Sequence, residues 1–271
     1  MYVSDGRKLI AHAFRHGYAL PAFNFCSLEM AKGCVEAAEE LGAPVILQTY
    51  QSDLSFASPR VMVGMVRALA EDASVPVMLH LDHGKGLETA VECLRAGYSS
   101  VMFDGGSLAF EEVLQTTRAV SAIAHAAGAS LEVSAESFNK GESETTNPEE
   151  ALRLKEAGAD MVACSVGSEH AQESRLDRPR LAEIARTVQG PLVLHGGSGV
   201  HPADLRAAPK LGVVKVNVGS ASYRALLSVW RERSAELPSH RAVYTEARQA
   251  VREQAKKYIQ LLGADTAPAW R

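Results

Sequence analysis

The sequence predicts a (β/α)8 barrel (a TIM barrel) with extra helices at its C-terminal end. Short β-rich runs alternate with amphipathic stretches along the whole chain. Eight such units fit into 271 residues, a usual size for this barrel. No linker or low-complexity run marks a second domain, so we expect residues 1–271 to form a single barrel domain. A doubly wound open sheet is the alternative, but the even strand spacing marks no switch point.

Eight segments rich in β-forming residues are the expected strands: 19–25, 44–50, 76–82, 99–104, 129–135, 160–166, 191–197 and 212–218. Apolar residues recur at helical spacing between them, most clearly in 28–41, 58–72 and 110–128. Two charged helices, 221–236 and 241–262, are expected outside the barrel. The long polar segment 136–150 predicts a loop after the fifth strand.

Composition argues against two classes of partner. The net charge is −4 and no basic run occurs, so we expect neither nucleic acid nor a membrane surface as a partner. Cys26, Cys34, Cys93 and Cys164 lack a paired CxxC spacing. Reduced thiols in a cytoplasmic protein are the interpretation that this favours.

Histidines follow three of the expected strands, at the end of the barrel where active sites lie. They are His83 after the third strand, His170 after the sixth and His195 at the end of the seventh. Imidazoles suit zinc, and three protein ligands leave a fourth position open for a substrate oxygen. A single histidine is more often an ordinary core or surface residue, so the prediction of a metal site depends on all three converging.

Acidic residues accompany these histidines. In "VMLHLDHGKG" Asp82 directly precedes His83, and Asp104 ends the fourth strand. Glu132 lies in the fifth strand and Glu142 in the loop beyond it. Because adjacent residues of a strand point to opposite faces, we expect a local bend that brings Asp82 and His83 to the same mouth.

Two glycine-rich strand ends predict a phosphate site. They are "LVLHGGSG" (192–199) and "VNVGS" (216–220). Glycines let backbone N–H groups approach an anion, and Ser198 and Ser220 add hydroxyl donors. Either motif alone could be only a tight turn, whereas neighbouring strands that both carry one favour phosphate binding.

These motifs resemble the class II, zinc-dependent ketose-bisphosphate aldolases, the fructose- and tagatose-bisphosphate enzymes. The resemblance covers nearly the whole chain and includes "GYALPAFNF" (17–25), "LHLDHG" (79–84), "AGYSSVMFDGGSLAFEE" (96–112), "GSEH" (167–170) and "KVNVGS" (215–220). It implies cleavage of a sugar phosphate or ketose to dihydroxyacetone phosphate and an aldehyde through a zinc-stabilised ene-diolate. It also implies one Zn²⁺ per subunit, with other divalent metals open, a monovalent cation near the donor phosphate, and a homodimer or homotetramer.

The resemblance assigns roles residue by residue. His83, His170 and His195 match the zinc ligands, Asp82 matches the acid–base at the C4 hydroxyl, and Glu142 matches the glutamate that moves a proton at C3. Asp104 and Glu132 match positions of an alternative metal site. The matching substrate contacts are Asn24, Tyr50, Ala171, Gly196, Gly197, Ser198, Asn217, Val218, Gly219, Ser220 and, from a neighbouring subunit, Arg241.

Departures from the family pattern concern substrate choice. Ser134 replaces a second glutamate, Ala171 replaces a glycine beside the donor phosphate, and the polar loop is shorter. Tyr50 stands where a serine near the aldehyde's phosphate is common. The pattern predicts a working aldolase with an altered substrate, whose donor is either dihydroxyacetone phosphate or a non-phosphorylated or modified ketose.

Two other functions remain open. Lys215 on the eighth strand could serve a Schiff-base aldolase, because a desolvated lysine can be nucleophilic. An inactive partner subunit of an aldolase is the non-enzymatic alternative. The three histidines and Asp82 speak against it.

Overall fold

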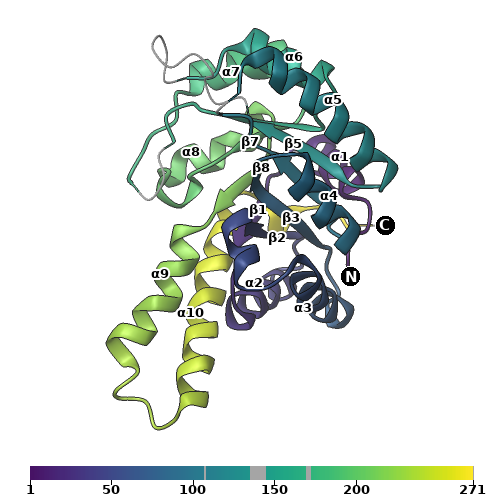
Figure 1. Cartoon of the computed structure of the whole chain (residues 1–271). Helices are drawn as coiled ribbons and strands as arrows, with labels where there is room; N and C mark the ends of the chain where they lie inside the picture. The colour runs from purple at the N-terminus through teal and green to yellow at the C-terminus, as the bar shows by residue number, and fades with distance from the viewer. Residues whose placement is uncertain (107, 135–144, 169–171, 271) are drawn as a thin grey trace.

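The computed structural model describes residues 1–106, 108–134, 145–168 and 172–270. Eight parallel strands form a closed barrel in chain order (Figure 1). They are β1 (Leu20–Asn24), β2 (Val45–Tyr50), β3 (Val77–Gly84), β4 (Ser100–Phe103), β5 (Ser130–Ser134), β6 (Met161–Cys164), β7 (Leu192–Leu194) and β8 (Val213–Val218). β8 pairs with β1 and closes the ring, with Asn217 opposite Ala22. The predicted barrel is therefore confirmed, and an open sheet is wrong.

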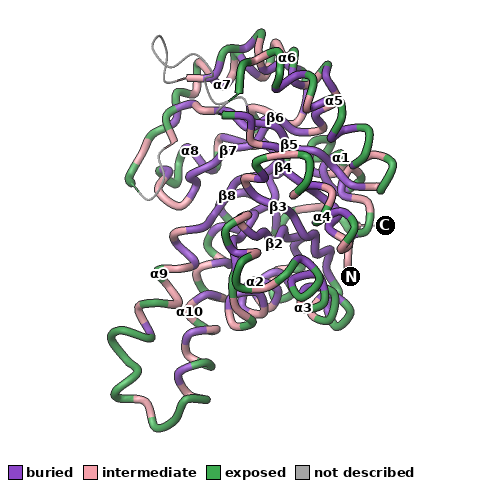
Figure 2. Tube along the Cα trace, viewed as in Figure 1, coloured by how far each residue is buried: buried purple, intermediate pink, exposed green. Residues whose placement is uncertain are grey.

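Helices surround the barrel, and Figure 2 shows the buried strands at its centre with exposed residues on the outer helix faces. They are α1 (Gly6–His16), α2 (Leu28–Glu40), α3 (Pro59–Asp72), α4 (Leu87–Ala96), α5 (Phe110–Ala126), α6 (Pro148–Glu156), α7 (Arg178–Val188), α8 (Pro202–Ala207), α9 (Ser220–Ser228) and α10 (His240–Leu261). The expected polar loop ends earlier than predicted. Asn147 caps α6 by accepting a hydrogen bond from Glu149 N, and Pro148 suits the first helical turn.

Helix α1, which the sequence analysis did not anticipate, packs at the end of the barrel where the strands begin. A Cβ added to Gly6 would lie 2.2 Å from the carbonyl oxygen of Ser99 and 2.8 Å from Ser130 Oγ. Only glycine lets the helix approach the starts of β4 and β5 this closely. Leu9, Ile10 and Ala13 are buried, so this face of α1 belongs to the core.

The C-terminal helices form an arm that projects from the barrel (Figure 1). Toward its tip a small apolar cluster of Val229, Val243 and Ala247 lies between the two sides of the arm. The middle of α10 lies against α2. A Cβ on Gly33 would come within 2.7 Å of the Arg248 carbonyl oxygen, so a glycine is needed at this crossing. Among the described residues, no helix is both long and apolar enough to cross a membrane.

The interior of the barrel toward the strand ends is polar. Gln48, His80, Glu132 and Lys215 are fully buried, although they are polar or ionisable. Burial of such groups is costly unless each finds a hydrogen-bond or charge partner. The hydrogen bonds and ion pairs of these four side chains therefore fix the geometry of the barrel interior beneath the candidate site.

Candidate functional site

Strand β3 bends at Asp82 and His83. The register with β4 shifts between Leu81 and Gly84, and His83 adopts a left-handed φ of 52°. The expected bend is thus present. It brings Asp82 Oδ1 to 3.9 Å from His83 Nε2. A Cβ on Gly84 would lie 2.5 Å from the Met102 carbonyl oxygen, so the bend also requires a glycine at its end.

Asp104 at the end of β4 orients His83. Its Oδ2 lies 2.7 Å from His83 Nδ1, and its Oδ1 accepts a bond from Gly106 N. The hydrogen bond with His83 holds the pKa of Asp104 below its usual range. The carboxylate fixes the proton on Nδ1, which leaves Nε2 as the electron-pair donor of the ring.

Glu132 in β5 orients His195 in the same way. Its Oε1 lies 2.8 Å from His195 Nε2, and its Oε2 forms an ion pair of 2.9 Å with Lys215 Nζ. Burial alone would raise the pKa of Glu132, but Lys215 and then the bond from His195 outweigh it and hold that pKa below its usual value. Lys215 also donates to Asn217 Oδ1. His195 and Asn217 are thereby linked through buried charges.

Asp82 is held by side-chain amides from three strands. Asn24 donates to Oδ2 at 2.8 Å, Gln48 donates to Oδ2 at 3.1 Å, and Asn217 donates to Oδ1 at 3.0 Å. The carboxylate is 1% exposed. Three donors leave it little rotational freedom, so its oxygens are aimed at a defined point.

These groups line a cavity of ≈ 220 Å³ at the barrel mouth. Its wall consists of Tyr50, Asp82, His83, Gly196, Ser198, Asn217, Gly219, Ser220 and Tyr223. A Cβ on Gly219 would come within 2.8 Å of Tyr50 Oη and 2.9 Å of Asn24 Oδ1, so the backbone there is close-packed against the wall. Ser220 Oγ is buried, and within the described parts of the chain it has no hydrogen-bond partner.

Donor atoms of Asp82, His83 and His195 lie within 4.8 Å of one another. Two imidazoles and a carboxylate are donor types that zinc accepts. Each imidazole has a carboxylate on its other nitrogen, the arrangement usual around metal-binding histidines. The residues present therefore fit a divalent metal. His170, Ala171 and Glu142 lie outside the described residues.

Other predicted residues lie as follows. Val218 is buried in β8 beside Asn217. The ring of Tyr50 stacks near His83, with centroids 6.3 Å apart. Arg241 is exposed in the first turn of α10, which begins at the tip of the arm, away from the barrel (Figure 1). Arg241 is not among the described residues that line the ≈ 220 Å³ cavity, whereas Ser220 and Tyr223 at the start of α9 are.

Three residues of this region were missed from the sequence: Gln48, Tyr223 and, as a link in the charge network, Lys215. Gln48 could have been found from strand alternation, because it lies two residues before Tyr50 and pairs in register with Asn24 and His80. Tyr223 gives no comparable signal, since it enters the cavity wall from the first turn of α9.

Comparison with known proteins agrees with this geometry. The family model described as "Fructose-bisphosphate aldolase class-II" matches residues 4–267. A fructose-bisphosphate aldolase of Thermus caldophilus is 33% identical over 298 residues, covering 96% of this chain and 97% of the relative. A sulfofructosephosphate aldolase of Alkalicoccus urumqiensis is 33% identical over 230 residues, covering 80% of each.

The crystal structure of the YdjI aldolase from Escherichia coli K12 superposes with a TM-score of 0.87 at 30% identity. It covers 97% of this chain and 98% of that one. A family match over nearly the whole length, relatives above 30% identity and the same barrel lead to one conclusion. This chain belongs to the class II fructose-bisphosphate aldolase family and is an aldolase, a carbon–carbon lyase.

Proposed function

We propose that this aldolase is metal-dependent and reversibly cleaves a ketose 1-phosphate or 1,6-bisphosphate into dihydroxyacetone phosphate and an aldehyde. The observation that carries the proposal is the convergence of Asp82, His83 and His195 within 4.8 Å beside one cavity. A general base next to two carboxylate-oriented imidazoles is what metal-assisted cleavage of a carbon–carbon bond requires.

The protein's own groups divide the work. Asp82, which three side-chain amides hold in place, accepts the proton of the C4 hydroxyl as the C3–C4 bond breaks. The electron pair of the C3–C4 bond stays with the donor half. His83, His195 and His170 would hold a divalent metal, which would supply positive charge for the anion that develops on the donor. Glu142 then delivers a proton to C3. The donor phosphate is bound by Ser198, Ser220 and the glycines of the loops that follow β7 and β8.

Proton exchange at C3 of dihydroxyacetone phosphate tests this proposal without a choice of aldehyde. Zinc-loaded protein in heavy water should wash out the C3 proton signal in NMR, and a chelator should stop the exchange. Asp82→Asn should keep this exchange but lose cleavage of the ketose phosphate, because Asp82 acts on the C4 hydroxyl. No exchange by protein shown to hold zinc would contradict the proposed donor and favour a non-phosphorylated or modified ketose, or an inactive partner subunit.

The Schiff-base alternative finds no support in the surroundings of Lys215. Its ammonium group is fully buried, ion-paired with Glu132 and hydrogen-bonded to Asn217. A nucleophilic lysine needs a neutral amine with access to the substrate carbonyl. Borohydride in the presence of dihydroxyacetone phosphate should therefore leave Lys215 unmodified. A mass increase on that residue would reverse the assignment.

Tyr50 supports an acceptor aldehyde that lacks a distal phosphate. Its ring lies beside His83, and its hydroxyl packs against Gly219. A phosphate at that end would need the space that the ring fills. The sulfofructosephosphate aldolase of Alkalicoccus urumqiensis suggests an aldehyde screen that includes a sulfonate.

We also propose a homodimer or homotetramer in which the arm makes the contact. Exposed Trp230 and Tyr244 stack edge to face on it, with ring centroids 5.3 Å apart. Arg241 lies in the first turn of α10, at the tip of the arm. In such an oligomer the arm of a second copy would bring its Arg241 to the substrate of the first. Light scattering of Trp230→Glu should report a smaller particle than that of the wild type.

The remaining parts of the proposal concern the whole chain. Residues 1–271 act as one barrel domain, and a monovalent cation accompanies the donor phosphate. Cys26, Cys34 and Cys93 are free thiols, which favours a reducing, cytoplasmic location. Calorimetry with one cooperative transition would support the single domain, whereas two separable transitions would oppose it.

A further inference from the structure

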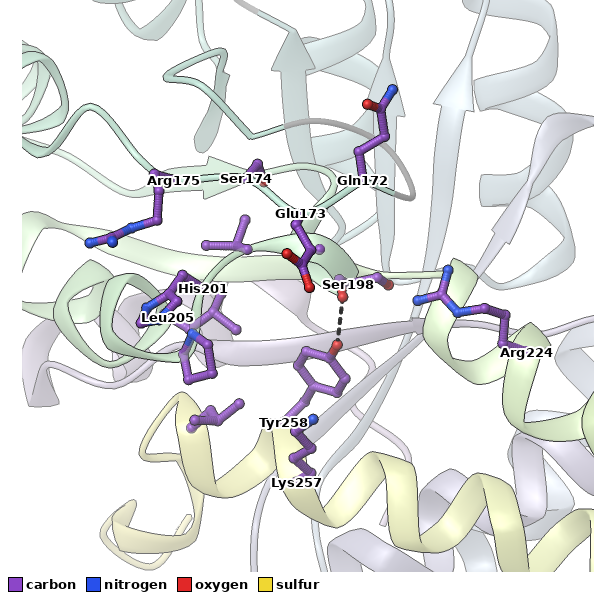
Figure 3. A pocket seen from close by; sticks show the side chains of 14 residues that line it. Gln172, Glu173, Ser174, Arg175, Ser198, His201, Leu205, Arg224, Lys257 and Tyr258 are labelled. Carbon is purple, nitrogen blue, oxygen red and sulfur yellow. Dashed lines mark hydrogen bonds between the residues drawn. The ribbon is translucent and has the colours of Figure 1, made fainter.

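A second hollow adjoins the catalytic cavity on the far side of Ser198. It measures ≈ 590 Å³ and is lined by the segment before α7, the loop after β7, and helices α8, α9 and α10 (Figure 3). A neighbouring hollow of ≈ 410 Å³ shares Ser198, Arg224, Lys257 and Tyr258 with it. Ser198 also lines the catalytic cavity. Ser198 thus lies between the donor end of the catalytic cavity and the ≈ 590 Å³ hollow.

Two of its cations lack a counter-ion. Among the described residues, neither Arg224 nor Lys257 forms an ion pair. Arg175, which also lines the hollow, differs because its guanidinium is neutralised by the buried Asp204 at 2.6 Å. Figure 3 draws Arg224 reaching from α9 toward Ser198, with Lys257 below on α10. Two uncompensated positive charges from separate helices therefore face one hollow.

Among the described residues that line the hollow, a single carboxylate opposes these charges. Glu173 enters the hollow from the segment before α7, and Figure 3 shows its side chain directed toward Ser198. His201 and Tyr258 also line the hollow as titratable groups, and Nδ1 of His201 accepts a bond from Ala203 N. Arg224, Lys257 and Glu173 together leave one positive charge in excess among the described lining residues. An anion at this place is favoured, although by a modest amount because the side chains are exposed.

Ser198 itself is firmly positioned. Its Oγ accepts a bond of 3.2 Å from Ala221 N in the first turn of α9, and its carbonyl oxygen accepts one of 2.9 Å from Tyr258 Oη. The hydroxyl proton of Ser198 remains available to a substrate oxygen. The same helices that carry Arg224 and Lys257 therefore hold the serine that meets the donor.

We propose that Arg224 and Lys257 form a cationic subsite that selects a donor with a phosphate ester over a neutral dihydroxyketone. This inference rests on the proposed function and deepens it, because it commits the donor to a dianion. Long-range attraction raises the affinity for a dianionic donor, whereas a neutral donor gains nothing from these charges.

The test compares two donors and matched charge variants. Arg224→Gln, Lys257→Gln and the double variant are measured with dihydroxyacetone phosphate and with dihydroxyacetone. Arg231→Gln and Lys210→Gln, exposed cations outside the hollow, are the controls. The readouts are C3 exchange in heavy water at subsaturating donor and calorimetric titration of the apoprotein with inorganic phosphate.

Each single variant should weaken binding of dihydroxyacetone phosphate and inorganic phosphate by about three- to tenfold, with the larger loss at low salt. Any exchange of dihydroxyacetone should stay unchanged, and Glu173→Gln should strengthen phosphate binding. The inference is overturned if the double variant binds both phosphates within twofold of wild type, or if wild type exchanges both donors equally well. If the wild type exchanges neither, the proposed function fails, and the phosphate titration still decides the subsite.

Discussion

Glu132→Gln should both destabilise the protein and weaken metal binding at the candidate site. The substitution keeps the shape of the side chain but removes the charge that pairs with Lys215 Nζ at 2.9 Å. Both side chains are fully buried, so the substitution leaves the Lys215 side chain in the interior without its counter-ion. Removal of one partner from a buried pair costs about 3–5 kcal/mol. At roughly 2 °C per kcal/mol for a chain of this length, Tm should fall by about 6–10 °C.

The same change alters the second nitrogen of His195. Glutamine offers one carbonyl oxygen where Glu132 offers two carboxylate oxygens, so Nε2 loses a charged acceptor at 2.8 Å. Loss of such an orienting partner lowers metal affinity by about 10- to 100-fold. Competition with a fluorescent zinc chelator measures this loss, and urea unfolding monitored by circular dichroism measures the stability.

A second substitution separates the two effects. Glu132→Gln combined with Lys215→Met removes both charges, so most of the lost stability should return while metal affinity stays low. Glu40→Gln is the control, because Glu40 pairs with Lys256 at the surface, where solvent screens the pair and its loss should change stability little. The reasoning is refuted if Glu132→Gln unfolds within 1 kcal/mol of wild type, or if the double variant is as unstable as the two single losses added together.

Three further predictions concern single residues. Asp104→Asn should lower zinc affinity by about 10- to 100-fold in chelator competition, because it removes the charge that orients His83, and an unchanged affinity would contradict this. Tyr50→Ser should shift the kcat/KM ratio toward aldehydes with a distal phosphate, whereas an unchanged ratio would remove Tyr50 from substrate choice. Asp204→Asn should cost about 1–3 kcal/mol at neutral pH, because it removes the charge and leaves one accepting oxygen for Arg175, Arg178 and the buried Leu176 N. Burial raises the pKa of Asp204, but the bonds from Arg175, Leu176 and Arg178 outweigh it and lower that pKa to about 2. The folded pKa is depressed, so this stabilisation is present above the ordinary pKa of about 4 and should vanish as pH falls toward 2. Urea unfolding at several pH values would test it, and a difference between variant and wild type that does not shrink with acid would disprove it.

Local patterns determined much of this molecule. Alternation of β-rich and helical periods is a property of each segment by itself, so all eight strands could be placed within a few residues. The adjacency of Asp82 and His83 at a strand end required a bend, because a regular strand points neighbours to opposite faces. The left-handed backbone of His83 and the register shift are that bend. The same kind of reasoning missed α1, which docks on the barrel through contacts far along the chain.

Only the tertiary structure decided which side chains meet across the barrel. Glu132 and His195 are 63 residues apart, and Asp82 and Asn217 are 135 apart. Their contacts depend on strand register and barrel closure, which no local period encodes. The need to pair buried charges then gave Glu132 and Lys215 their positions beside the candidate metal site, because an unpaired charge in the barrel would cost a large share of the protein's net stability.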